Sequence, residues 1–192
     1  LASSAASDVY KRQVLVVEEG TTIRLGADEH ITVAGRIIIQ GTTTNPVTIE
    51  SISGKHDGIV FNQSSQGLGS NIENLTILQA EFGITIYGSD PQLNDINIEN
   101  VDRVGVDLFD GATPTINNLV INGGGADVHG FSTTWRYGIG LSIGANSAPI
   151  VNGFSANGLI TRAINYWGNS GGLLSDLEIS NISGATLAVS TG

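Results

Sequence analysis

The phrase Asn71-Ile-Glu-Asn-Leu-Thr-Ile77 is the first of five similar seven-residue phrases in this chain of 192 residues. The other four are Gln92-Leu-Asn-Asp-Ile-Asn-Ile98, Thr115-Ile-Asn-Asn-Leu-Val-Ile121, Ile150-Val-Asn-Gly-Phe-Ser-Ala156 and Leu173-Leu-Ser-Asp-Leu-Glu-Ile179. Corresponding residues follow one another by 21, 23, 35 and 23 residues, so one repeat holds an insertion. Self-similarity at a nearly fixed period is typical of a solenoid, in which each repeat packs on its neighbours.

The second, fifth and seventh positions of the phrase are apolar in every repeat, which predicts three ladders of side chains in a core. The fourth position holds residues that tolerate left-handed backbone, so we expect a sharp bend there. This column consists of Asn74, Asp95, Asn118, Gly153 and Asp176.

A second short strand is expected after each phrase, at residues 83–87, 105–109, 138–142, 163–167 and 184–188. Alternation with period two predicts one packed face and one outer face. We expect one outward column to hold Thr85, Asp107, Gly140 and Asn165, and the next to hold Tyr87, Phe109, Ser142 and Trp167. Two short strands per repeat, without a helical pattern or a leucine-rich consensus, predict an all-β parallel β-helix with coils about 4.8 Å apart.

The pattern Asn-x-x-Ile/Leu-x-Ile followed by Gly-Ile/Val-x-Leu/Ile resembles the right-handed parallel β-helix repeats of pectin-lyase-like proteins. Residues 20–26, 31–41 and 45–49 look like the first coils of the same family, so the resemblance covers about residues 14–192. It implies a right-handed β-helix solenoid with coils of about 21–23 residues, six or seven in all. It implies no single function, because this scaffold carries enzymes, adhesins and passive stalks.

Residues 1–13 match nothing in the repeat, and residues 4–13 resemble translated adapter read-through of metagenomic assemblies. The alternative is a genuine disordered extension, and either way we exclude this leader from the domain at 14–192. Methionine is absent, so we expect a fragment or a processed form. Truncated coils around Ile23 and Leu187 would expose strand edges, which predicts self-association or fraying of the fragment.

The composition argues against several classes of partner. Eighteen acidic and eight basic residues give a formal net charge of −10, which argues against nucleic acid and against anionic membrane surfaces. No apolar run approaches the ~20 residues of a membrane span. Cysteine is absent, which excludes disulfides and thiolate metal sites. The resemblance implies an extracellular or cell-surface location.

The insertion at residues 122–137 is the first place where we expect function, because long loops on rigid scaffolds often carry it. Together with the outward aromatic column it supplies nine candidate ligand-binding residues: Tyr87, Asp107, Phe109, Asp127, His129, Trp135, Arg136, Tyr137 and Trp167. We expect Trp167 to lie about 10 Å from Phe109, two coils away, with Trp135 bridging the gap. The alternative is that the rings are structural and lie buried beneath the loop or a neighbouring domain.

Catalysis has little support in the sequence, and we assign no catalytic residue. Asp102, Asp107 and Asp110 form the one close carboxylate cluster, and the polygalacturonase segments of the family are missing. No cofactor is expected; residues 122–130 resemble a calcium-binding nonapeptide only weakly. We therefore expect a non-catalytic secreted or cell-surface scaffold that binds glycan or a protein partner. The alternative is a polysaccharide lyase or glycoside hydrolase of the same fold.

Overall fold

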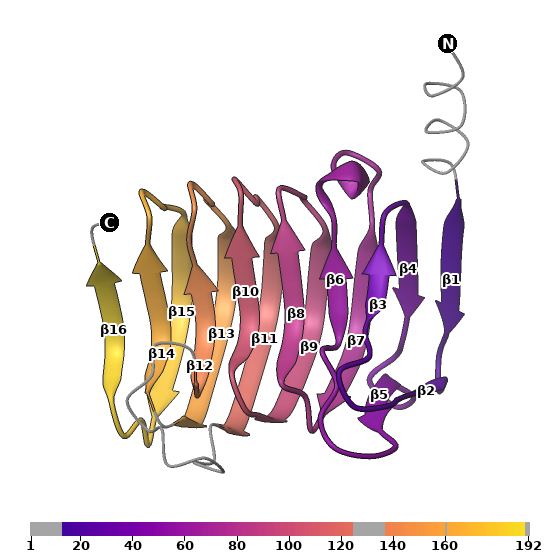
Figure 1. Ribbon diagram of the computed structural model, residues 1–192, viewed down its shortest axis with the longest axis horizontal. Helices are drawn as coiled ribbons and strands as arrows, with labels where there is room; N and C mark the ends of the chain where they lie inside the picture. Colours follow the sequence, from indigo (N-terminus) through magenta and orange to yellow (C-terminus); the bar gives the residue numbers. More distant parts are fainter. Residues whose placement is uncertain (1–12, 125–136, 160, 191–192) are drawn as a thin grey trace.

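The computed structural model describes residues 13–124, 137–159 and 161–190, and within these ranges the protein is all-β (Figure 1). The leader predicted at residues 1–13 lies outside this part of the chain except for its last residue. One 3-10 turn, η1 (Gln63–Ser65), accompanies the strands. The strands are β1 (Val14–Glu18), β2 (Thr22–Leu25), β3 (Ile31–Val33), β4 (Arg36–Gln40), β5 (Val47–Ser51), β6 (Ile59–Phe61), β7 (Asn71–Leu78), β8 (Phe82–Tyr87), β9 (Gln92–Val101), β10 (Val104–Phe109), β11 (Thr115–Gly124), β12 (Ile139–Ile143), β13 (Ile150–Leu159), β14 (Arg162–Trp167), β15 (Leu173–Ser180) and β16 (Ala185–Ser190).

The strands form two sheets in which neighbouring strands run parallel. The first sheet has the order β1-β4-β7-β9-β11-β13-β15; in addition, β5 pairs with β7, and β2 pairs with β5. The second sheet has the order β16-β14-β12-β10-β8-β6-β3. From β6 onward the chain alternates between the sheets and advances by one strand in each, as Figure 1 shows. This arrangement is compatible with a parallel β-helix.

The register of the first sheet confirms the columns predicted from the repeated phrase. Ile72 pairs with Leu93, and the same register continues through Ile116, Val151 and Leu174. The 35-residue step keeps this alignment, so the extra residues lie between strands. The fifth and seventh positions align in the same way, and in β7, β9, β11 and β13 all three apolar columns are buried between the two sheets.

Phe154 and Ala156 exchange volume with their neighbours in the core. Both are buried. The large Phe154 pairs with the smaller Leu119, and the small Ala156 pairs with the larger Ile121. Space for the Phe154 ring comes from Gly140 on the opposite sheet, where an added Cβ would lie 3.1 Å from Phe154 Cζ. The glycine thus lets one repeat carry a ring in a ladder of aliphatic residues.

The bend predicted at the fourth position of the phrase is confirmed by its backbone angles. The φ angles are +48° at Asn74, +56° at Asp95, +57° at Asn118, +82° at Gly153 and +53° at Asp176. Asn118 Nδ2 also donates a hydrogen bond to Asp95 Oδ1 at 2.9 Å. The column therefore selects residues that accept positive φ, and adjacent members can bond to one another.

This bend gives the first testable prediction, a comparison of Asn118→Val with Asn118→Gly. Both variants remove the bond to Asp95, but only valine places a branched Cβ at φ +57°. We expect Asn118→Val to cost about 1–3 kcal/mol of unfolding free energy more than Asn118→Gly, because that backbone region is strained for branched residues. Urea unfolding measures the difference, and equal stabilities would contradict the role of positive φ.

A ladder of asparagines on the outer face of the first sheet was not predicted. Asn94 donates to Asn71, Asn117 to Asn94 and Asn152 to Asn117, with N···O distances of 2.8–3.0 Å. Ser175 continues the ladder with a hydroxyl bond to Asn152 at 3.3 Å. These side chains satisfy one another between strands. The ladder begins at the first position of the first phrase and continues along the third position of the later ones, which gives that position a structural role.

Both ends of the sheets present apolar side chains to solvent. Leu173 is 70% exposed and Val189 72% exposed in the last two strands, and Leu15 is 51% exposed in β1. Leu187, predicted to lie at an exposed edge, is 56% exposed. Self-association through such edges stays a prediction. Within the described residues there is no helix with the length and apolar character that a membrane crossing requires.

Candidate functional site

Three aromatic rings form a continuous row on the outer face of the second sheet, and we call Tyr87, Phe109 and Trp167 the aromatic strip. Tyr87 and Phe109 are register partners at the ends of β8 and β10, and their rings stack with centroids 5.1 Å apart. Phe109 and Trp167 meet edge to face at 5.7 Å. Tyr87 is 38% exposed and the other two rings are partly exposed. The strip thus crosses the strands as an accessible apolar surface.

The predicted gap between Phe109 and Trp167 is wrong, because the two rings are in contact. Gly144 directly follows β12, the strand between them, and the Trp167 ring lies over this glycine, where an added methyl group would overlap it. Trp167 Nε1 donates a hydrogen bond to Ser142 Oγ at 3.2 Å, which fixes the orientation of the indole ring. Trp135, predicted to bridge the gap, lies outside the described residues.

The predicted alignment of β12 is also corrected by two residues. Ser142 pairs with Asp107 and with Asn165, so it belongs to their column rather than to the aromatic one. Gly140 belongs to neither outward column: an added Cβ there would meet Phe154 in the core. Packing of Gly140 against the core side chains, as at Gly83 and Gly105, therefore sets the register of this strand.

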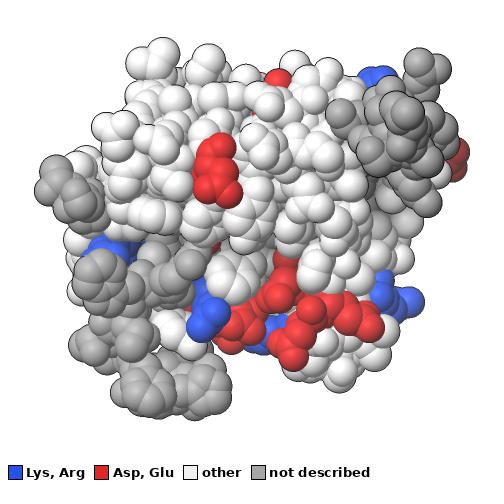
Figure 2. All heavy atoms as spheres, turned by 45° about the horizontal axis from the view of Figure 1, so that its top comes forward, with Lys and Arg blue, Asp and Glu red and all other residues white. Residues whose placement is uncertain are grey.

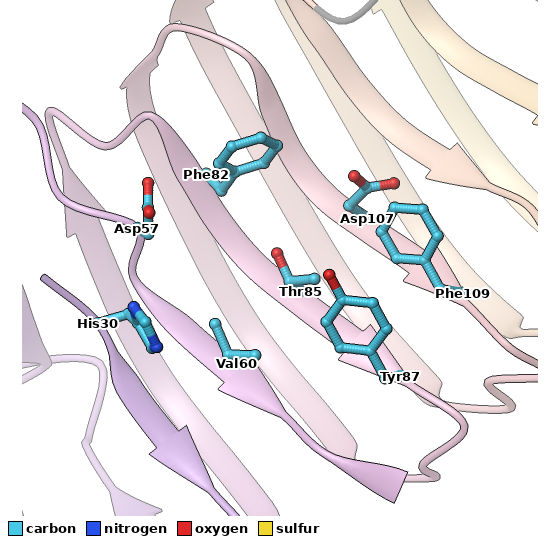
Figure 3. Close-up of a pocket in the computed structure, with 8 residues that line it drawn as sticks. All are labelled: His30, Asp57, Val60, Phe82, Thr85, Tyr87, Asp107 and Phe109. Atoms are coloured by element: carbon cyan, nitrogen blue, oxygen red, sulfur yellow. The ribbon is translucent and has the colours of Figure 1, made fainter. Parts of the chain in front are cut away.

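A hollow with a volume of about 340 Å³ opens beside the Tyr87 end of the strip. Figure 3 shows its eight lining residues, with Asp57 and His30 on one side and the strip residues on the other. The register of β6, β8 and β10 aligns Val60, Thr85 and Asp107 across its floor. The described residues that line it are His30, Asp57, Val60, Phe82, Thr85, Tyr87, Asp107 and Phe109.

Asp107 was predicted to point outward, and it does line the hollow, but its exposure is 0%. Thr85, Ser142 and Asn165 of the same column are likewise buried, at 7%, 4% and 9%. In Figure 3 the rings of Phe82 and Phe109 lie to either side of Asp107. Short side chains between tall rings are shielded although they face away from the core.

Acidic side chains dominate the surroundings of the hollow. Figure 2 shows a group of acidic residues with fewer basic residues among them on this part of the surface. Burial raises the pKa of Asp57, and the nearby Asp28 raises it further, against the opposing effects of His30, His56 and Arg103. Burial likewise raises the pKa of Glu81, although Arg103 opposes the change.

Two cations near the hollow, Arg103 and Lys55, are engaged with other groups in the described part of the chain. Arg103 Nε lies 3.0 Å from Glu81 Oε1, and its guanidinium lies over the rings of Phe82 and Tyr137, at 5.4 and 5.0 Å from their centroids. Lys55 Nζ lies 3.2 Å from Asp102 Oδ1 and donates to the Asn100 carbonyl at 2.9 Å. Neither cation is among the residues that line the hollow.

Of the other predicted site residues, Tyr137 lies within the described part of the chain and four lie outside it. Tyr137 stacks on Arg103, and its hydroxyl oxygen lies 3.4 Å from Arg103 Nη2, so this ring is engaged away from the strip. Asp127, His129, Trp135 and Arg136 lie outside the described residues, as does most of the calcium-like segment 122–130. Among the residues that are described, no group of three or more histidines and carboxylates could hold a metal ion.

The predicted carboxylate cluster does not form a single site. Asp102 and Asp110 lie beyond opposite ends of β10, while Asp107 lies within it. Asp102 pairs with Lys55, and Asp110 adopts φ +55° in the exposed turn after the strand. The carboxylate that does accompany Asp107 in the hollow is Asp57, from the segment before β6.

His56 beside this carboxylate is a buried structural residue that the sequence analysis did not find. Gly58 N–H donates to its Nδ1 at 3.0 Å, so Nε2 carries the proton and donates to the Leu78 carbonyl at 3.0 Å. Burial lowers the pKa of His56, which favours this neutral form. The ring therefore ties the backbone directly after Asp57 to the end of β7.

Five lining residues were also missed: His30, Asp57, Val60, Phe82 and Thr85. His30 and Asp57 stand in irregular segments ahead of β3 and β6, where no phrase repeats. Thr85 is expected on the outer face but is not among the nine candidate ligand-binding residues. Comparison of the chain with protein-family models, with curated protein sequences and with solved structures finds no match.

Proposed function

We propose that this chain is a non-catalytic scaffold with a right-handed, pectin-lyase-like parallel β-helix of 21–23-residue coils, which binds an extended glycan along the aromatic strip. The observation that carries the proposal is the unbroken contact from Tyr87 through Phe109 to Trp167. Flat, partly exposed rings desolvate the apolar faces of sugar rings, and a row of them suits a chain of sugars. A secreted or cell-surface location fits such a ligand.

Polar groups beside the strip support a glycan rather than an apolar ligand. His30 and Asp57, which are not buried, line the adjoining hollow and supply donors and acceptors for sugar hydroxyls. Binding sites of this kind combine apolar faces with a few placed polar groups. A protein partner could use the same rings, so a defined glycan is the ligand with which the proposal must be tested.

Two variants test the strip by different means. Trp167→Ala deletes its ring, while Gly144→Ala leaves the ring but adds a methyl group in its place, so the indole must move away. We expect each variant to bind immobilised polysaccharides about 3- to 10-fold more weakly, which corresponds to one aromatic contact. Tryptophan fluorescence should shift in Gly144→Ala, because the indole leaves Phe109 and Ser142.

The matched control is Ile52→Ala, which removes an apolar side chain that is 67% exposed elsewhere on the surface. It should bind like the unmodified chain. Retention that is unchanged in both strip variants, or a loss of more than ~2 kcal/mol in folding stability without an effect on binding, would show that the rings are structural.

A polysaccharide hydrolase or lyase is the second candidate, and one observation favours it. Asp57 and Asp107 line the same hollow, and the pKa of Asp57 is raised, as expected for a carboxyl that donates a proton. Incubation with polysaccharides followed by detection of new reducing ends separates the two candidates. Depolymerisation that disappears in Asp107→Asn would replace the scaffold by an enzyme.

A further inference from the structure

We infer that the hollow binds the ammonium group of a basic amino sugar, so that the preferred glycan is positively charged. This inference rests on the proposed function and names the ligand class of the same site. It starts from the lining, which combines two carboxylates with two stacked rings and contains no lysine or arginine among its eight residues. Carboxylates together with ring faces are the groups that bind organic ammonium ions.

The charge of the hollow is the first step. Asp57 and Asp107 both contribute carboxyl groups, and Asp28 lies near enough to raise the pKa of Asp57. Among the described residues, the cations Arg103 and Lys55 pair with Glu81 and Asp102 outside the lining. A uronic acid placed here would bring a further negative charge beside two carboxyl groups, which is unfavourable.

The hydrogen-bonding state of Asp57 is the second step. Its Oδ1 atom is buried, and no hydrogen-bond partner for it occurs within the described ranges. A buried carboxylate oxygen without a donor is costly, and a neutral sugar hydroxyl would supply a donor but no charge. An ammonium group supplies three donors and a positive charge, so it matches this oxygen better.

The rings are the third step. Tyr87 and Phe109 stand across the hollow from Asp57 with their faces stacked (Figure 3). A sugar lying on these rings can direct a substituent into the hollow while the rest of the chain follows the strip toward Trp167. The Tyr87 face that is turned away from Phe109 also attracts a cation that lies close to it. Strip and hollow thus act on one ligand, the first on the sugar ring and the second on its amine.

The test compares oligomers of β-1,4-linked glucosamine with their fully N-acetylated counterparts, which have the same linkage but no charged amine. We expect calorimetry with the full chain at neutral pH to show at least tenfold tighter binding of the glucosamine oligomer. Asp57→Asn should reduce that preference to less than threefold, and Phe109→Ala should weaken both oligomers. The charge control is Glu178→Gln on exposed β15, which should retain the preference.

Salt provides a second measurement that needs no variant: higher ionic strength should weaken the glucosamine oligomer and leave the acetylated one unchanged. Equal binding of both oligomers, or a preference that survives in Asp57→Asn, would overturn the ammonium assignment while the proposed glycan binding stands. No retention of any glycan would overturn both. Poly-lysine binding with equal affinity through Asp57 and Phe109 would overturn the assignment to a sugar.

Discussion

Leu119→Ala is expected to lower the free energy of unfolding by about 2–5 kcal/mol, because it removes three carbons from a filled core. Leu119 has 0% exposure in the middle of the first sheet. Its register partners are Ile96 on one side and Phe154 on the other, so neighbours on two strands would line the resulting cavity. Parallel strands held by ladders on both sides cannot move inward to close it.

The matched control is Val120→Ala, at the next residue of the same strand. Val120 is on the opposite face and partly exposed, so its loss should cost less than about 1 kcal/mol. Urea unfolding followed by circular dichroism measures both variants against the unmodified chain. A cost below about 0.5 kcal/mol for Leu119→Ala would show that this column does not face the core.

The register of the first sheet could be predicted from the sequence because like residues stack in it. Each of the first-sheet strands β7, β9, β11, β13 and β15 carries the same apolar positions, and a slip by one residue would turn them all outward. The bend column was equally predictable, since asparagine, aspartate and glycine share a tolerance for positive φ. These signals are local to each repeat and need no knowledge of distant contacts.

The register of β12 could not be predicted in the same way. Glycines occur within and beside this strand, at 138, 140 and 144. An alignment that places Gly138 opposite Gly83 and Gly105 differs from the observed register by two residues. The true counterpart is Gly140, because it faces Phe154 across the core. This register places Gly144 beneath the indole of Trp167. Because glycine has no side chain, the indole can lie over it and reach Phe109.

The hollow itself was only half predictable. Tyr87, Phe109 and Asp107 lie on strands with clear alternation, so their outer position could be inferred from parity. Asp57 and His30 come from segments without a repeat, and only the pairing of β3, β6 and β8 brings them beside the others. Burial of Asp107 was missed because parity gives the direction of a side chain but not the height of its neighbours.

His56→Ala is the second large effect that we expect, with a loss of about 2–4 kcal/mol. The variant leaves the Gly58 N–H and the Leu78 carbonyl without their partners, and unsatisfied buried backbone groups cost about 1–3 kcal/mol each. His30→Ala, which removes an exposed imidazole, is the control and should cost less than about 0.5 kcal/mol. Equal effects of the two substitutions on urea unfolding would contradict the structural role of His56.

The same histidine should make folding stability depend on pH in a defined direction. Its pKa is lowered in the folded chain, so below about pH 6.5 the unfolded chain binds more protons at this residue than the folded chain does. The stabilisation is therefore complete above about pH 6.5 and is lost as the pH falls toward the folded-state pKa.

Asp57 and Glu81 act in the opposite direction, because their raised pKa values let the folded chain bind protons first as the pH falls toward about 4. Their contribution is removed by comparing the unmodified chain with His56→Gln, which keeps both carboxyl groups and cannot titrate at residue 56. The stability advantage of histidine over glutamine should shrink steadily between pH 7 and pH 5 in urea unfolding. An advantage that stays constant or grows on acidification would contradict the lowered pKa of His56 in the folded protein.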